Sequence, residues 1–115
     1  MNAINILVVE DDEMMAGTLG DWFAEYNEKR ESLFLSWEVV GTTIAAIDRL
    51  MKPGIDVCLL DVNLPSIKGN RLSEVLKSQS NKKDIPIVLI SDLPERSEEM
   101  FPSSGANAWM RKPLT

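Results

Sequence analysis

The chain has 115 residues, which is enough for one compact domain and too few for two. A hydrophobic fraction of 44% supports a folded core, and a net charge of -6 argues against direct binding to nucleic acids or anionic membranes. Histidine is absent, which excludes a histidine base and zinc sites with imidazole ligands.

Cys58 is the single cysteine, so no intrachain disulfide can form and a reducing cytoplasm is the expected location. Met1 to Ile4 lacks the basic region of a signal peptide, and Glu10 interrupts the apolar run that follows. No apolar stretch is long enough to span a bilayer, so membrane insertion is not expected.

The first predicted element is a strand over residues 4–9, a nearly continuous apolar run of the kind that is buried on both faces. A helical stretch follows, and a polar loop is predicted over residues 27–32. The helical stretch has one apolar stripe, whose aromatic residues Trp22 and Phe23 are expected in the core: Met15, Leu19, Trp22, Phe23 and Tyr26.

The next predicted elements are a strand over residues 34–40 and a short helix. Thr42 is expected to cap this helix, and Pro53-Gly54 to end it. The remaining pattern predicts a strand over 55–60, a helix through Leu72 and Leu76, a strand over 85–90, at most a short helix between Pro94 and Pro102, and a strand over 106–110.

Strands that alternate with helices indicate parallel pairing through right-handed crossovers, and therefore a doubly wound α/β fold with a five-stranded parallel sheet. Such sheets bind ligands beyond the carboxyl ends of their strands. The residues that end the predicted strands there are an acidic run, an aspartate, a hydroxyl and a basic pair: Glu10-Asp11-Asp12, Asp61, Ser91 and Arg111-Lys112.

The charges at this edge favour a cation site. Glu10, Asp11 and Asp61 contribute three negative charges and Lys112 returns one positive charge, so a divalent cation would neutralise the remainder. Magnesium prefers oxygen ligands and keeps waters, so two carboxylates and a backbone carbonyl are sufficient. Beside magnesium, Asp61 could attack a phosphoryl group, as carboxylate nucleophiles do.

Four sequence blocks in order resemble those of response-regulator receiver domains. They are ILVVEDD, LLDVNLPSIKG, IPIVLIS and GANAWMRKP, and they extend over nearly the whole chain. The resemblance implies a flavodoxin-like strand order 2-1-3-4-5. It also implies roles for the matching residues. Asp61 would be the phosphoacceptor and would bind Mg²⁺ together with Glu10, Asp11 and the backbone carbonyl of Asn63. Ser91 and Lys112 would contact the phosphoryl group, and Ser91 and Trp109 would be the switch residues.

The function that this resemblance implies is a signalling domain, not an enzyme, that promotes its own aspartyl phosphorylation and dephosphorylation. A histidine kinase or phosphotransfer protein would donate the phosphoryl group to Asp61. The resulting change would be read by a C-terminal effector domain or a homodimer partner. Residues 1–115 are expected to form one receiver domain, the N-terminal part of a longer response regulator.

Three features depart from the family pattern: Asp92 replaces a usually small residue, the fourth helix is short, and the fifth helix is absent from this chain. They leave open a pseudo-receiver that binds proteins without phosphorylation. An enzyme or cofactor protein of similar topology is a third alternative. Taken alone, the run Glu10-Asp11-Asp12 is more typical of a solvated loop or a helix N-terminus than of a metal site.

Overall fold

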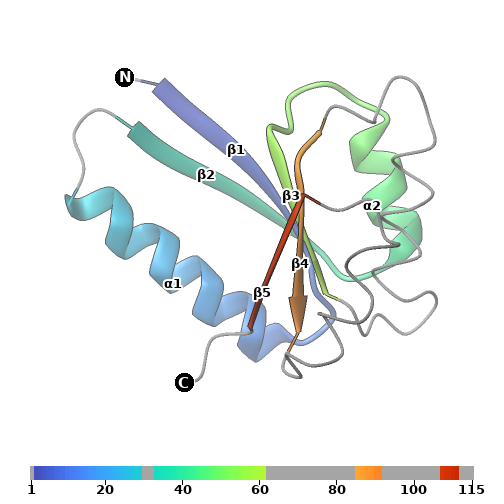
Figure 1. The fold of residues 1–115 in the computed structure, drawn as a ribbon, viewed down its shortest axis with the longest axis horizontal. Helices are drawn as coiled ribbons and strands as arrows, with labels where there is room; N and C mark the ends of the chain where they lie inside the picture. Colours follow the sequence, from blue (N-terminus) through green and yellow to red (C-terminus); the bar gives the residue numbers. More distant parts are fainter. Residues whose placement is uncertain (1, 30–32, 62–84, 92–106, 112–115) are drawn as a thin grey trace.

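The computed structural model describes residues 2–29, 33–61, 85–91 and 107–111. Five strands and two helices are placed in these ranges (Figure 1). In chain order they are β1 (Asn2–Val9), α1 (Glu13–Lys29), β2 (Leu33–Val40), α2 (Thr43–Leu50), β3 (Val57–Asp61), β4 (Ile87–Ser91) and β5 (Ala108–Arg111). None of the helices in the described ranges is long and apolar enough to cross a membrane.

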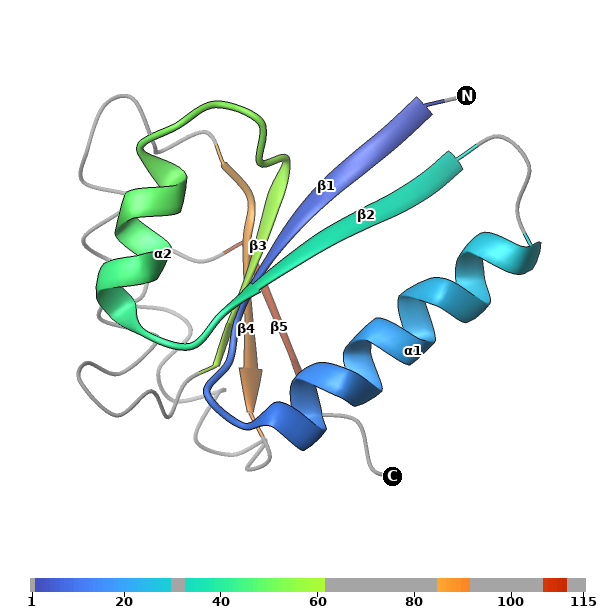
Figure 2. The same cartoon turned by 180° about the vertical axis from the view of Figure 1, so that it is seen from behind.

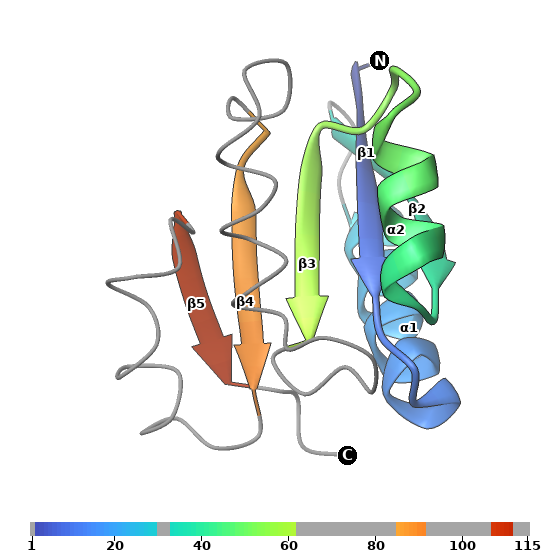
Figure 3. The same ribbon diagram turned by 90° about the vertical axis from the view of Figure 1, so that its right-hand side faces the viewer.

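All five strands pair in parallel in the order β2-β1-β3-β4-β5, as the sequence predicted. The register places Val9 beside Leu60, Asp61 beside Ile90, and Ser91 beside Arg111. The carboxyl ends of β3, β4 and β5 consequently meet at one edge of the sheet, where Figure 3 shows their arrowheads side by side. The chain leaves β1 at the same edge.

The core consists of two apolar layers, one on each face of the sheet. Because successive strand residues face opposite sides, Leu7 and Val9 pack with α2 whereas Ile6 and Val8 pack with α1. The two helices therefore cover opposite faces, as Figures 1 and 2 show from either side. The central strands are the most deeply buried, which explains why their sequences are continuous apolar runs and not alternating patterns.

Helix α1 differs from its prediction in two respects. It continues to Lys29, so the predicted loop over 27–32 starts too early. Trp22 was expected in the core but is 48% exposed, because it lies at the margin of the stripe that buries Leu19. Phe23 does pack inward, with its ring centroid 5.5 Å from that of Trp37 on β2.

Helix α2 begins and ends as predicted. The Thr42 side chain accepts a hydrogen bond from the Ala45 backbone N–H at 3.1 Å, and the turn that follows the helix contains Gly54 at φ +115°. The Arg49 guanidinium joins α2 to β2 through hydrogen bonds to both carboxylate oxygens of Glu38. These bonds lower the pKa of Glu38 below its ordinary value.

The predicted third, fourth and fifth strands are present, with boundaries displaced by one or two residues toward the carboxyl end. Asp61, for example, was predicted to begin a loop but is the last residue of β3. The predicted helix through Leu72 and the short fourth helix lie outside the described residues.

Candidate metal and phosphoacceptor site

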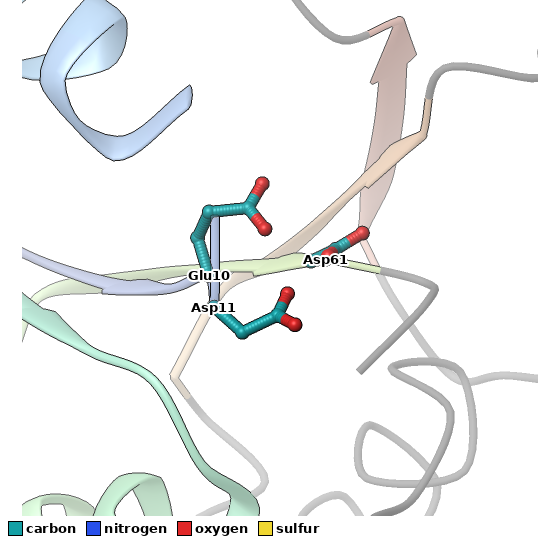
Figure 4. Close-up of side chains that lie close together, drawn as sticks. All are labelled: Glu10, Asp11 and Asp61. Carbon is teal, nitrogen blue, oxygen red and sulfur yellow. The ribbon is translucent and has the colours of Figure 1, made fainter. Parts of the chain in front are cut away.

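Three carboxylates gather where β1 and β3 end. Glu10 follows the last residue of β1, and its backbone N–H donates to the carbonyl of Val40 at 2.9 Å, which keeps the chain aligned with β2 beyond the strand. Asp11 comes next, and Asp61 ends β3. One ligand oxygen from each of Glu10, Asp11 and Asp61 lies within 4.8 Å of the others. Figure 4 shows these three side chains, called the acidic cluster below.

The members of the acidic cluster differ in their access to solvent. Glu10 is 2% exposed and Asp61 is 1% exposed, whereas Asp11 is exposed. Carboxylates held this close repel one another when all are ionised, and a cation or a proton relieves the repulsion. Oxygen donors in such a set suit a hard divalent cation. The structure thus brings together the three acids that the sequence predicted as metal ligands, and their donor set fits such an ion.

Asp12, the third acid of the run, has a different role. Its Oδ1 accepts hydrogen bonds from the backbone N–H groups of Met14 at 2.9 Å and Met15 at 3.4 Å. Its carbonyl accepts from the N–H of Ala16 at 2.9 Å, so Asp12 is the N-cap of α1. The acidic run was predicted to suit a helix N-terminus, but no cap was assigned to Asp12. The available signal was an aspartate directly before a helical pattern, but three successive acids made its exact position ambiguous.

The other predicted site residues are placed only in part. Ser91 ends β4 and Trp109 lies in β5, and in the sheet Ser91 is paired with Arg111. The backbone of Ser91 therefore ends its strand at the same edge as Asp61. Asn63 and Lys112 lie outside the described residues, as does Asp92.

Cys58 lies near the amino end of β3, in the apolar core and away from the acidic cluster. Its side chain is fully buried, and burial raises the pKa of the thiol from 9.0 to about 12. The thiol is therefore protonated at neutral pH and unsuited to nucleophilic attack or metal binding. This agrees with the prediction that Cys58 is a small apolar core residue.

Comparison with known protein families shows which family the chain belongs to. The model of the response regulator receiver domain matches residues 6–115. The chain belongs to this family. The matched region contains the whole acidic cluster and all five strands except the first residues of β1.

Individual relatives agree with this assignment to the receiver family. The response regulator PleD of Caulobacter vibrioides is 33% identical over 111 residues, which cover 95% of this chain and 23% of PleD. The signal receiver domain of a signal transduction histidine kinase from Syntrophus aciditrophicus is 27% identical, with a TM-score of 0.79 and coverage of 96% of this chain and 80% of that one.

A third relative shares the receiver fold and was solved with a metal. It is the receiver domain of the sensor histidine kinase PA1611 from Pseudomonas aeruginosa, with a magnesium ion coordinated in its active site cleft. It is 21% identical, with a TM-score of 0.77 and coverage of 98% of this chain and 88% of that one. The 115-residue chain, a receiver domain, spans only 23% to 45% of the length of PleD and several other curated relatives.

Proposed function

We propose that this receiver domain is a phosphoacceptor switch in two-component signalling, phosphorylated on Asp61 with the help of Mg²⁺. One observation carries the proposal: Glu10 and Asp11 directly after β1 and Asp61 at the end of β3 each place a carboxylate oxygen within 4.8 Å of the others. A buried aspartate beside two further acids is suited to a reaction in which a cation and a phosphoryl group are brought together.

Asp11 and Asp61 are the direct magnesium ligands in this proposal, together with the backbone carbonyl of Asn63. Glu10 would hold the ion through a water molecule. When bound, the ion would neutralise the acidic cluster and offset the charge of the phosphoryl oxygens. The PA1611 receiver domain, whose magnesium ion lies in the active site cleft, supports the same location on this fold.

The proposed reaction is a transfer of one phosphoryl group to Asp61. An oxygen of the Asp61 carboxylate attacks the phosphorus of a phosphohistidine or an acyl phosphate. The new P–O bond forms as the bond from phosphorus to the donor nitrogen or oxygen breaks, and the donor leaves with the bonding electron pair. Hydrolysis of the resulting aspartyl phosphate restores the carboxylate.

Two residues would read the phosphorylated state. The Ser91 hydroxyl would donate to a phosphoryl oxygen, and the Lys112 ammonium would pair with another. Movement of Ser91 and of the aromatic Trp109 would then shift the population of two conformations. We propose a signalling role in the cytoplasm, with a histidine kinase or phosphotransfer protein as donor and an effector domain or homodimer partner as reader.

The test is incubation of the whole chain with acetyl phosphate, with and without magnesium, followed by intact-mass measurement. The expected result is a gain of one phosphoryl group that requires magnesium. Asp48→Asn is the matched control for Asp61→Asn, because Asp48 is an exposed aspartate on α2 outside the acidic cluster. This variant should be labelled like the unmodified chain.

The opposite result has a defined meaning. If the folded chain gains no phosphoryl group at any magnesium concentration, the phosphoacceptor function is wrong. The alternative of a pseudo-receiver, which binds partners without phosphorylation, would then be favoured. Asp92→Ala should be tested in parallel, because a carboxylate at that position is expected to slow labelling by repelling the donor.

A further inference from the structure

We infer that Asp12 is a positioning residue for the acidic cluster: as the N-cap of α1, it holds its own backbone N–H against the Glu10 carboxylate. The inference rests on the proposed magnesium site and adds to it a residue that is not a ligand. Among the described acids, Asp12 is not one of the three whose oxygens come within 4.8 Å.

Two groups of hydrogen bonds meet at Asp12. Its side chain and carbonyl accept from the N–H groups of Met14, Met15 and Ala16, which ties the residue to the first turn of α1. Its own N–H donates to Oε2 of Glu10 at 3.3 Å. The cap fixes the backbone of Asp12, and the backbone directs the N–H toward Glu10.

The position of Asp11 depends on the same arrangement. Glu10 is held on one side by its bond to Val40, and Asp12 is held on the other by the helix. Asp11 lies between these two anchored residues and is itself exposed, so loss of either anchor would loosen a direct ligand. A Cβ atom on Gly41 would lie 3.9 Å from both the Asp11 Cα and the Glu10 carbonyl oxygen, so the residue that follows β2 is within van der Waals reach of this segment.

Outer groups that orient ligands commonly change metal affinity without touching the metal. A single hydrogen bond of 3.3 Å is at the weak end of such contacts. Asp12→Ala should therefore weaken magnesium binding by about tenfold, the lower end of the usual range for outer partners. Asp12→Asn and Asp12→Ser keep a capping oxygen and remove the negative charge, so both should bind magnesium nearly as well as the unmodified chain.

Thr42→Ala provides the matched control for stability. Thr42 caps α2 as Asp12 caps α1. The hydrogen bonds that Thr42 accepts come from the N–H groups of Ala45 and Ala46, both within α2 and outside the acidic cluster. Both alanine variants should lower the melting temperature, because each helix loses its cap. Only Asp12→Ala should lower the magnesium affinity.

The experiment is a magnesium titration by calorimetry on the unmodified chain and the four variants, with thermal melting and amide hydrogen exchange measured without metal. Asp12→Ala should also speed exchange of the Met14 N–H, and Asn or Ser should restore slow exchange. Equal magnesium affinity in Asp12→Ala and the unmodified chain would overturn the positioning role alone. Equal weakening in Ala, Asn and Ser would also overturn it, because charge would then be the cause. No binding by the unmodified chain would overturn the magnesium site and this inference with it.

Discussion

Strand β3 is preceded by one aspartate and ends in another, and the two have opposite surroundings. Asp56 directly precedes the strand and is exposed; its Oδ2 accepts from the backbone N–H of Asn5 at 2.8 Å, and its own N–H donates to the Asn5 carbonyl at 2.8 Å. Asp61 ends the strand, is 1% exposed, and lies beside the carboxylates of Glu10 and Asp11. Both residues are aspartates, but of the two only Asp61 lies beside other carboxylates that could bind a cation with it.

The difference supports the proposal that the carboxyl edge of this receiver sheet holds the functional site. At the amino edge, an exposed carboxylate completes backbone hydrogen bonding between β1 and β3 and is otherwise solvated. At the carboxyl edge, chain direction brings the ends of several parallel strands together, so acids distant in sequence become neighbours.

The largest expected effect is that of Asp61→Asn. The amide preserves the shape of the side chain but removes the charged oxygen that is proposed to attack phosphorus, so labelling by acetyl phosphate should be abolished while the fold remains intact. Intact-mass measurement and far-ultraviolet circular dichroism together check this outcome. Full labelling of the folded variant would assign the phosphoryl group to another residue.

The next largest effect concerns Asp11→Asn. Loss of one direct carboxylate ligand should weaken magnesium binding by more than about tenfold, since the ion depends on charged oxygen donors. Calorimetric titration measures the affinity, and Asp48→Asn again serves as the control for removal of one negative charge. A variant that binds magnesium as tightly as its control would show that Asp11 is not a ligand.

Cys58 lies in β3, between Asp56 and Asp61 in the sequence. Ionisation of its thiol should lower the free energy of unfolding of the chain at alkaline pH. Its pKa is about 12 in the fold, raised by burial from 9.0. The protonated thiol contributes stability that is fully present below pH 9 and is lost as the pH rises toward 12, because the unfolded chain ionises first. The loss is at most about 4 kcal/mol, from three pKa units.

The measurement is denaturant unfolding between pH 8 and about 11, with Cys58→Ala as the comparison. The alanine variant starts less stable because it leaves a small cavity, but its stability should fall less steeply with pH. Parallel curves for the two proteins would contradict a raised thiol pKa.

The smallest effect is expected from Asp56→Ala. Removing an exposed acceptor for one backbone N–H should cost no more than about 1 kcal/mol, because water can replace the carboxylate. Phosphorylation and magnesium affinity should be unchanged. A loss of labelling comparable to that of Asp61→Asn would show that the two ends of β3 do not differ in function as described.

The parallel sheet and the acidic cluster could be predicted because both follow from regular patterns, whereas the strand order came from the resemblance to receiver domains. Buried parallel strands are continuous apolar runs, and their carboxyl ends share one edge, so Glu10, Asp11 and Asp61 could be grouped from the sequence alone. Strand ends were less predictable: apolar residues such as Ile55 and Ile85 lie just outside strands, where burial continues but pairing has stopped.

Other features depended on three-dimensional detail. The exposure of Trp22 follows from how α1 is rotated against the sheet, and an apolar stripe does not fix that rotation within one residue. The cap at Asp12 depended on which of three adjacent acids precedes the first helical turn. The predicted roles of Asn63 and Lys112 stay predictions, because these residues lie outside the described ranges.

The most direct test of the phosphoacceptor assignment is to locate the phosphoryl group on β3. The unmodified chain would be labelled with acetyl phosphate and magnesium, the acyl phosphate would be reduced with borohydride, and the β3 peptide would be sequenced by mass spectrometry. We expect the modification on Asp61, none on Asp56, and none at either residue when magnesium is omitted. Modification of Asp56, or equal modification without magnesium, would contradict the assignment of the acidic cluster as the phosphoacceptor site.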